Sequence, residues 1–289
     1  MENNILEQIK SKMPVLSKGQ KKIGNYIIEH YDKAAFMTAY KLGQQVNVSE
    51  STVVRFASVM GYEGFPEFQV ALGEIAKNHL TSLQRYEIAL DKMENNDILA
   101  KVISADISKL KNTFEQVDRD VFNNAVESIM NARNIYVIGV RSASALASFF
   151  GFYLNLIFDN VRLVHTNSMS EMFEQILRVG KGDVVIGITF PRYSKRTVKA
   201  TQYAKNKGAD VIGITDNFNS PIVENCTHSL FAKSDMVSFV DSLVAPMSVI
   251  NALIVALGMK KKEAVKESLS ELEEIWDEYN VYNKVKEDD

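Results

Sequence analysis

The chain has 289 residues, enough for two domains with separate hydrophobic cores. Its 46% hydrophobic and 24% charged residues are typical of a soluble globular protein, and no apolar run is long and clean enough to span a membrane. The N-terminus lacks the layout of a signal peptide, and the single cysteine, Cys226, excludes a disulfide framework. With only four histidines we expect no metal site and no cofactor. These features predict a cytoplasmic protein, and the net charge of -3 argues against indiscriminate nucleic-acid binding.

Positive charge is concentrated near the N-terminus. Between residues 10 and 41, seven lysines stand against two acidic residues, a local balance of +5. Lys18, Lys21 and Lys22 begin an amphipathic helical pattern there. Beside an element that binds DNA, such lysines would contact phosphates; the alternative is that they form an ordinary solvated helix face. Residues 1–77 together carry nine basic and eight acidic groups, so the patch is local.

The segment QQVNVSESTVVRFASVMGYEGF, residues 44–65, joins two short helical patterns at a three-residue break. Asn47 tolerates the left-handed conformation that a tight turn between helices needs, and Ser49 is a good N-cap for a helix that begins at Glu50. We expect Gly61 to end that helix. One face is an apolar stripe, made of Val53, Phe56, Ala57 and Met60. The opposite face is small and polar around one arginine, with Ser51, Thr52, Arg55 and Ser58.

This spacing is typical of the DNA-binding helix-turn-helix, in which the second helix enters the major groove. A plain helical hairpin with a solvated outer face would show the same pattern. On the first interpretation, the residues that we expect at the DNA are Lys18, Lys21, Lys22, Ser49, Glu50, Ser51, Thr52 and Arg55.

Residues 78–97 are polar and are interpreted as a linker, which leaves residues 98–289 for a second domain. Two helical stripes in that domain are more apolar than one small sheet domain needs. The first consists of Leu99, Ile103, Ile107, Leu110 and Phe114, and the second of Val265, Leu269, Leu272, Trp276 and Tyr279. They pack either within the protomer or across a two-fold axis, and we favour a homodimer because symmetric half-sites need two reading helices.

From residue 135 the sequence pattern changes to short apolar runs separated by helical patterns. The runs are IYVIGV, VRLVHT, DVVIGITF, DVIGITD and HSLFAK. Alternating strands and helices with doubly apolar strands predict a five-stranded parallel sheet, doubly wound in the flavodoxin-like order 2-1-3-4-5. In such a sheet a ligand binds beyond the carboxyl ends of strands one and three.

The two loops at that point, GVRSASALA and TFPRYSKRT, each lead into the N-terminus of a helix. Free backbone N–H groups and two helix dipoles favour an anion there, and Arg192 offers a forked contact to phosphate or carboxylate. Ser142 and Ser194 also have a simpler explanation as N-caps. The predicted ligand-binding residues are Arg141, Ser142, Ser144, Thr189, Arg192, Tyr193, Ser194, Thr197, Thr215 and Asp216.

No catalytic residue is predicted. A sugar isomerase needs a positioned acid or base near its phosphate site, and neither loop contains Glu or His. His165 and His228 are interpreted as ordinary strand-end residues. GVRSASA is not the dinucleotide fingerprint, because no glycines follow Gly139 at the required spacing.

The run STVVRF with GYEGFPEF, followed by GVRSAS, GITFPRYSKRT and VIGITDNFNSPI, resembles the RpiR/MurR family of bacterial transcriptional regulators. The resemblance covers roughly residues 1–258 and implies an all-α N-terminal helix-turn-helix domain followed by an α/β sugar isomerase (SIS) domain. It further implies binding of a double-stranded DNA operator and sensing of a sugar phosphate.

One loop departs from the usual SIS pattern Ser-x-Ser-Gly-x-Thr. Thr189 stands at its first serine, and FPRYSK replaces the glycine turn before Thr197, as in a Phe-Pro-Arg-Tyr-Ser branch of the family. A sugar acid or a polyol derivative therefore joins sugar phosphates as the expected effector. Two other interpretations remain at this stage: a sugar-phosphate isomerase with an accessory helical domain, and a sensor that binds another protein through its N-terminal helices.

Overall fold

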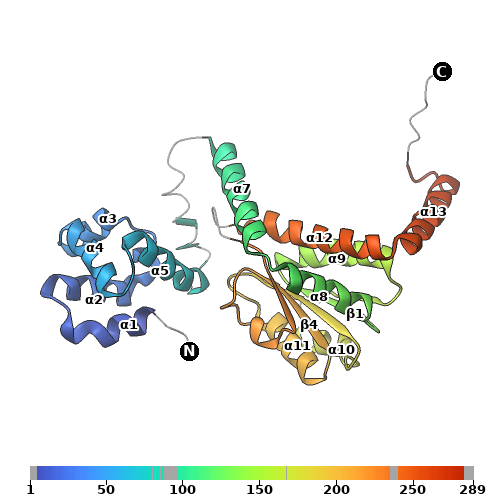
Figure 1. Cartoon of the computed structure of the whole chain (residues 1–289), viewed down its shortest axis with the longest axis horizontal. Coiled ribbons are helices and arrows are strands. Elements are labelled where there is room, and N and C mark those ends of the chain that lie inside the picture. Colours follow the sequence, from blue (N-terminus) through green and yellow to red (C-terminus); the bar gives the residue numbers. More distant parts are fainter. Residues whose placement is uncertain are drawn as a thin grey trace, which may run out of the picture. The chain divides into compact units, whose positions relative to one another are not determined.

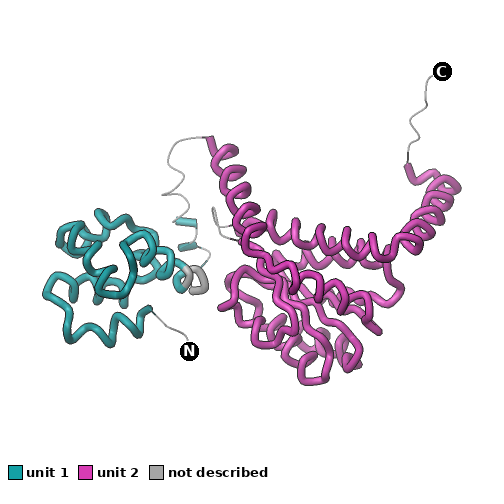
Figure 2. Tube along the Cα trace, viewed as in Figure 1, with its two compact units in different colours: residues 1–96 teal, residues 97–289 magenta. Residues whose placement is uncertain are grey.

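The computed structural model describes residues 5–79, 81, 83–84, 86–87, 97–166, 168–234 and 240–282. The chain divides into two compact units, residues 1–96 and residues 97–289, coloured separately in Figure 2. Most of the linker expected at residues 78–97 lies outside the described residues.

The first unit is helical and has its own core. Its elements are α1 (Ile5–Lys12), the 3-10 helix η1 (Met13–Val15), α2 (Lys18–Ala34), α3 (Ala39–Val46), α4 (Glu50–Val59) and α5 (Phe65–His79). The apolar faces of these helices meet in one buried cluster, in which Phe56 and Phe68 pack edge to face at 5.7 Å between ring centroids. The predicted core stripe of α4 is confirmed, because Val53, Phe56 and Ala57 are fully buried.

Local backbone chemistry explains how α3 turns into α4. Asn47 has φ 54° and ends α3 in the predicted left-handed conformation. A side chain is excluded at Gly43, since a Cβ there would lie 2.9 Å from the carbonyl oxygen of Val48. Gly61, with φ 96°, follows the end of α4 in a conformation that suits glycine. The helix-turn-helix break therefore follows directly from these residues.

The second unit is an α/β domain. Its elements are α7 (Ile98–Gln116), α8 (Arg119–Met130), β1 (Ile135–Gly139), α9 (Ala143–Ile157), β2 (Val161–Val164), α10 (Met169–Gln175), β3 (Val184–Ile188), α11 (Lys195–Asn206), β4 (Asp210–Thr215), η2 (Val223–Asn225), β5 (His228–Phe231), α12 (Val244–Lys260) and α13 (Lys262–Glu278). All strand pairs are parallel and the order is β2-β1-β3-β4-β5. The predicted doubly wound sheet is confirmed.

Helices cover both faces of this sheet (Figure 1). On one face, alternate strand residues such as Val137 and Ile186 pack with α8, α9 and α12 in one core. On the other face, residues such as Ile138 and Val185 pack with α10 and α11. Because both faces are covered, the strands are apolar throughout, as parallel strands usually are.

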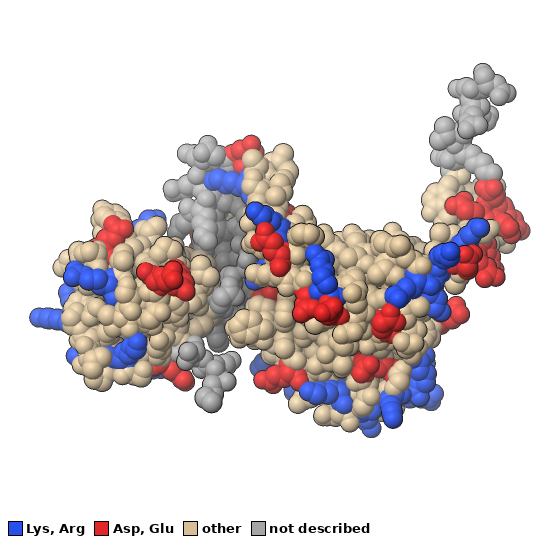
Figure 3. Space-filling view, in the orientation of Figure 1, with Lys and Arg blue, Asp and Glu red and all other residues tan. Residues whose placement is uncertain are grey.

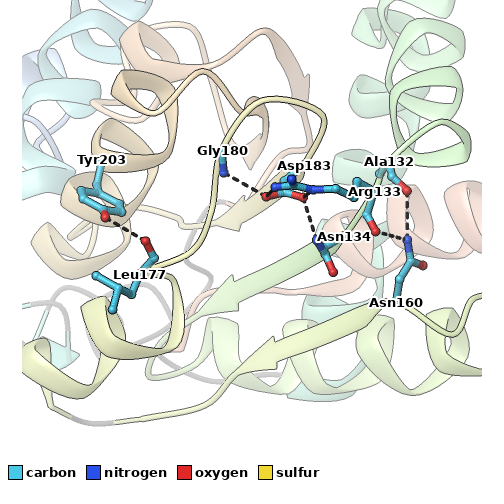
Figure 4. A network of polar contacts seen from close by, with 8 residues as sticks. All are labelled: Ala132, Arg133, Asn134, Asn160, Leu177, Gly180, Asp183 and Tyr203. Atoms are coloured by element: carbon cyan, nitrogen blue, oxygen red, sulfur yellow. Dashed lines mark hydrogen bonds and ion pairs between the residues drawn. The ribbon is translucent and has the colours of Figure 1, made fainter.

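A polar clamp joins the amino ends of β1 and β3 (Figure 4). The Asp183 carboxylate, 1% exposed, accepts two hydrogen bonds from the Arg133 guanidinium at 2.9 and 2.7 Å. It also accepts from the Asn134 side chain at 2.8 Å and the Gly180 backbone N–H at 2.9 Å. Burial by itself would raise the pKa of Asp183, but these donors outweigh it and hold the pKa below its ordinary value. The clamp fixes the edge of the sheet opposite the predicted ligand site.

The first helix of this unit, α7, docks by its polar face. Four members of its apolar stripe are exposed by 49–70% (Leu99, Ile103, Ile107 and Phe114). Lys109 and Thr113 are buried instead, at 5% and 6%. Within α13, no residue of the range Lys262–Glu278 is buried, and its surface in Figure 3 carries closely spaced acidic and basic side chains. Neither predicted stripe is therefore fully covered within the unit.

Among the described residues, no single helix is both long and apolar enough to cross a membrane, and α12 with α13 meets that test only as a pair bent by 97°. In the same part of the chain, no group of three or more His, Cys, Asp or Glu side chains is arranged to hold a metal ion.

Candidate DNA-binding helix and effector site

The outer face of α4 presents most of the predicted DNA-contacting residues. Glu50, Ser51 and Arg55 are exposed, and Thr52 is half-buried. Val54 is also exposed on this helix, by 40%, and was not among the predicted contacts. Its signal was available in the sequence, because a valine outside the core stripe is unusual on a solvated helix face.

Hydrogen bonds within α4 order the start of the helix. The Ser49 hydroxyl occupies the N-cap position but makes no capping bond to the backbone; it bonds the hydroxyls of Ser51 at 2.9 Å and Thr52 at 2.8 Å. This corrects the expectation that Ser49 caps through its side chain. The Arg55 Nε donates to the Ser51 carbonyl one turn earlier at 3.2 Å, which ties that exposed side chain to the first turn of the helix.

The basic start of α2 lies against the start of α4. A Cβ placed on Gly19 would be 3.4 Å from the Thr52 methyl group, so the first turns of the two helices touch. Lys18 and Lys22 are exposed there and Lys21 is half-buried. A capping box between Ser17 and Gln20 holds this end of α2. The predicted lysines therefore flank the exposed face of α4 within the first unit.

The predicted ligand-binding loops follow neighbouring strands at the carboxyl edge of the sheet. Gly139 of β1 is paired with Ile188 of β3, which is paired with Ile214 of β4. The loops that follow β1, β3 and β4 therefore begin side by side at this edge of the sheet. The helices α9 and α11 begin from the first two of these exits, so their N-termini approach the point where the winding of the sheet reverses.

Two arginines at this edge have left-handed backbones. Four non-glycine residues in the described chain have positive φ: two are asparagines, and the others are Arg141 at 59° and Arg192 at 68°. Arginine, unlike asparagine, gains no local hydrogen bond that favours this conformation. Such backbone strain clusters at ligand sites. Each arginine stands in the loop directly after β1 or β3, and both are exposed.

The hydroxyl groups in these loops are not used as helix caps. Neither Ser142 nor Ser194 makes a side-chain capping bond to its helix, which corrects the simpler explanation of both serines. The Ser144 hydroxyl donates to the Arg141 carbonyl at 2.6 Å. Thr197 is fully buried, and its hydroxyl has no hydrogen-bond partner within the described chain. An unsatisfied buried hydroxyl costs about 1–3 kcal/mol.

Three predicted contact residues are buried beneath the loops instead. Thr189, 3% exposed, accepts a hydrogen bond from the Ser194 backbone N–H at 3.1 Å. Asp216 accepts from the Tyr193 hydroxyl at 2.9 Å, from the Thr215 hydroxyl at 3.2 Å and from the adjacent Asn217 amide. Thr215 itself is 0% exposed. Thr189, Thr215 and Asp216 therefore support the loop that carries Tyr193.

The connection from β2 to α10 ends at the same edge. Ile138 of β1 pairs with Val164, and the next residues, His165 and Thr166, leave the sheet there. The Thr166 hydroxyl donates to Glu171. This loop brings His165 to the edge, and Thr166 links it to the carboxylate of Glu171 in the first turn of α10. The sequence signal for this placement was the strand order, since β2 is the neighbour of β1.

A short series of hydrogen bonds runs from this edge to α7. The Ala232 backbone N–H donates to the Thr215 carbonyl at 2.7 Å, and the next N–H, of Lys233, donates to the Thr113 hydroxyl at 2.9 Å. Two turns earlier on α7, Asp106 accepts from Lys109 at 3.3 Å and from the Ser242 hydroxyl at 2.6 Å. Polar contacts thus fix α7 to the segments on either side of residues 235–239.

Two cavities in the second unit lie away from these loops. One, of about 480 Å³, is lined by β2, the end of α10 and the turn after it, and includes Arg162 and Arg178. The other, of about 370 Å³, is at the amino edge and includes Ser128 and His228. The arrangement of charge and strain, not cavity size, identifies the carboxyl edge as the candidate site.

Comparison with known proteins assigns both units. The profile of the helix-turn-helix domain, rpiR family, matches residues 3–79, and that of the SIS domain matches residues 128–256. The chain belongs to the RpiR family. Among relatives of this RpiR regulator is the HTH-type transcriptional regulator HexR of Escherichia coli (strain K12), 25% identical over 280 residues that span 94% of this chain and 93% of HexR. HexR of Pseudomonas aeruginosa is 26% identical over 217 residues, which span 73% of this chain and 73% of that HexR.

Solved structures share the fold of this RpiR regulator. The Vibrio vulnificus NanR protein complexed with ManNAc-6P aligns with a TM-score of 0.58 at 23% identity, over 94% of this chain and 98% of NanR. The sugar isomerase domain of an RpiR transcription factor from Sphaerobacter thermophilus aligns with a TM-score of 0.59 at 25% identity, over 62% of this chain and 99% of that chain. This chain is accordingly a transcriptional regulator of the RpiR type with a SIS domain.

Proposed function

We propose that this RpiR regulator reads a DNA operator through α4 and that an anionic sugar metabolite binds at the carboxyl edge of its sheet. The observation that carries the effector site is the pair of left-handed arginines, Arg141 and Arg192, in adjoining loops. A strained backbone persists where the surroundings enforce it, and two such positions with one charge sign favour a shared anionic ligand.

The groups around the arginines fit that ligand. Helices α9 and α11 direct their N-termini to the same edge, where backbone N–H groups and helix dipoles stabilise an anion. Ser142 and Ser194 keep hydroxyl groups that no cap consumes. In our assignment, Arg141, Arg192 and the two serines contact the metabolite. Thr197 offers its hydroxyl if the loop opens.

The chemical class of the metabolite follows from charge and from one relative in structure. NanR is complexed with ManNAc-6P, so sugar phosphates are the first class to test. The loop from Thr189 to Thr197 contains FPRYSK in place of a glycine turn, and Arg192 binds carboxylate as well as phosphate. Sugar acids therefore belong in the same test.

The assembly that we propose is a homodimer. The exposed stripe of α7, with Leu99, Ile103, Ile107 and Phe114, gives a second copy an apolar surface to cover. A dimer also places two copies of α4 on the half-sites of a symmetric operator. Light scattering of the full chain at micromolar concentration should give twice the monomer mass. A monomer with undiminished operator affinity contradicts this assembly.

A thermal-shift screen tests the effector site. The panel contains fructose 6-phosphate, N-acetylmannosamine 6-phosphate, gluconate, myo-inositol and inorganic phosphate. A ligand at 100 times its dissociation constant stabilises the folded protein by about 2.7 kcal/mol, which is readily detected as a raised melting temperature. The same sugar phosphates are then assayed for aldose-ketose interconversion. Turnover would favour the isomerase interpretation, in which His165 or Glu171 acts as the base.

A further inference from the structure

Two valines on α4 have nearly equal exposure but different places on the helix. Val54 is 40% exposed and Val59 is 39% exposed, and neither belongs to the core of the first unit. Isolated exposed apolar residues are common on protein surfaces, so exposure alone decides nothing. The place of each valine relative to the reading end of the helix does distinguish them.

Val54 lies among the residues that would face DNA. It is one turn after Ser51, directly before Arg55, and one turn before Ser58, all of them exposed. A recognition helix contacts base edges with its N-terminal residues, and Val54 is the fifth residue of α4. Valine also favours a helix less than alanine, lysine or glutamate does, so an apolar branched side chain there has no local structural benefit.

Val59 is at the opposite end, against α1. Its carbonyl accepts a hydrogen bond from Lys12 at 2.6 Å, and the next carbonyl, of Met60, accepts from Gln8 at 2.7 Å. Five residues of α-helix place it about 7.5 Å farther along the axis than Val54. The two valines are therefore a matched pair, one at the reading end and one beside a neighbouring helix.

In the major groove, the apolar feature of a base edge is the C5 methyl group of thymine. We propose that Val54 contacts this methyl group and makes thymine the preferred base at one position of each operator half-site. The proposal rests on the proposed reading of DNA by α4. Because Val54 and Arg55 are consecutive, and arginine pairs best with guanine, that thymine should lie within one or two base pairs of a guanine.

The test removes one methyl group from either partner. Full-length wild-type protein first selects duplexes from a random pool, and each thymine of the selected site is then replaced singly by deoxyuridine, which lacks only the methyl group. Dissociation constants are measured for the wild type, Val54→Ala and the control Val59→Ala. Alanine is the stronger helix former, so both variants should fold.

The expected result is a loss of about fourfold in wild-type affinity at one thymine per half-site, the effect of burying one methyl group. Val54→Ala should bind the thymine and deoxyuridine duplexes equally at that position, while Val59→Ala should keep the wild-type difference. If Val54→Ala retains the full deoxyuridine penalty, or if no thymine shows one, Val54 does not read the base. Failure of the wild type to select any duplex overturns DNA reading itself, and this assignment with it.

Discussion

Replacing Arg192 by two different residues separates its role in binding from its role in the loop. Arg192→Ala and Arg192→Gly both remove the guanidinium, but only glycine adopts φ 68° without a steric cost. A non-glycine residue in the left-handed region costs roughly 1–2 kcal/mol relative to glycine. The two variants should therefore lose effector binding equally, while the glycine variant unfolds at the higher temperature.

The size of the binding loss follows from the contact that is removed. A hydrogen bond to a charged group contributes about 1.5–3 kcal/mol, so both variants should bind the metabolite roughly tenfold to 150-fold more weakly. Operator affinity without metabolite should stay close to that of the wild type, because Arg55 belongs to the other compact unit.

Isothermal titration calorimetry of the best ligand from the thermal-shift panel measures the binding loss, and thermal unfolding measures the difference between alanine and glycine. Lys199→Ala, which removes an exposed positive charge from the second turn of α11, controls for net charge and should bind normally. If Arg192→Ala binds the metabolite as the wild type does, the assignment of Arg192 is refuted. If it unfolds many degrees lower and loses operator binding, Arg192 is a structural residue.

Three further predictions concern other parts of the chain. Arg55→Ala should weaken operator binding by about 1–3 kcal/mol in a gel-shift titration and relax specificity at one base pair, whereas Lys21→Ala should weaken all sequences alike and flatten the salt dependence; equal affinity of Arg55→Ala and the wild type contradicts base reading. Thr113→Val leaves the Lys233 N–H without its acceptor, so this variant should bind the metabolite normally but show no change of operator affinity when the metabolite binds. Thr113→Ser keeps a hydroxyl and should retain the change. An unchanged response in Thr113→Val excludes a role for the hydrogen bond between Thr113 and Lys233. The pKa of Asp183 is lowered in the folded state, so the stabilisation by its carboxylate is present above the unfolded pKa of about 4 and is lost as the pH falls through the folded value. The free energies of unfolding of the wild type and Asp183→Asn, measured in urea, should therefore converge below about pH 4. A difference that stays constant at all pH values contradicts this prediction.

The fold could be predicted from the sequence because each element is specified by local chemistry. Asn47, Gly43 and the stripe of α4 together leave one way to form the helix-turn-helix, and these features can be read without any tertiary information. The sheet order followed from doubly apolar strands and the right-handed winding of such units. Periodicity did not show which neighbour covers an apolar face. It therefore missed that α7 docks through Lys109 and Thr113 and leaves its stripe outward.

The candidate effector site was predictable in place but not in detail. Strand order indicates which loops meet, so Arg141 and Arg192 were identified from the sequence. Nothing in an arginine indicates a left-handed backbone, because the surroundings impose it. Likewise, Ser194 and Thr215 have similar sequence signals, but the Ser194 hydroxyl makes no capping bond, whereas Thr215 is fully buried and its hydroxyl bonds to Asp216 and Ser220. Only the hydrogen-bond partners of each group distinguish a contact residue from a supporting one.

Control of DNA reading by the effector site is tested by measuring operator affinity by fluorescence anisotropy, with and without a saturating concentration of the metabolite that the thermal-shift screen identifies. A coupling free energy of about 1–3 kcal/mol between two sites is typical, so we predict a change of roughly fivefold to 150-fold in operator affinity. The change should vanish in Arg192→Ala. A metabolite that binds the wild type at the carboxyl edge while leaving operator affinity unchanged would contradict the claim that this site controls DNA reading.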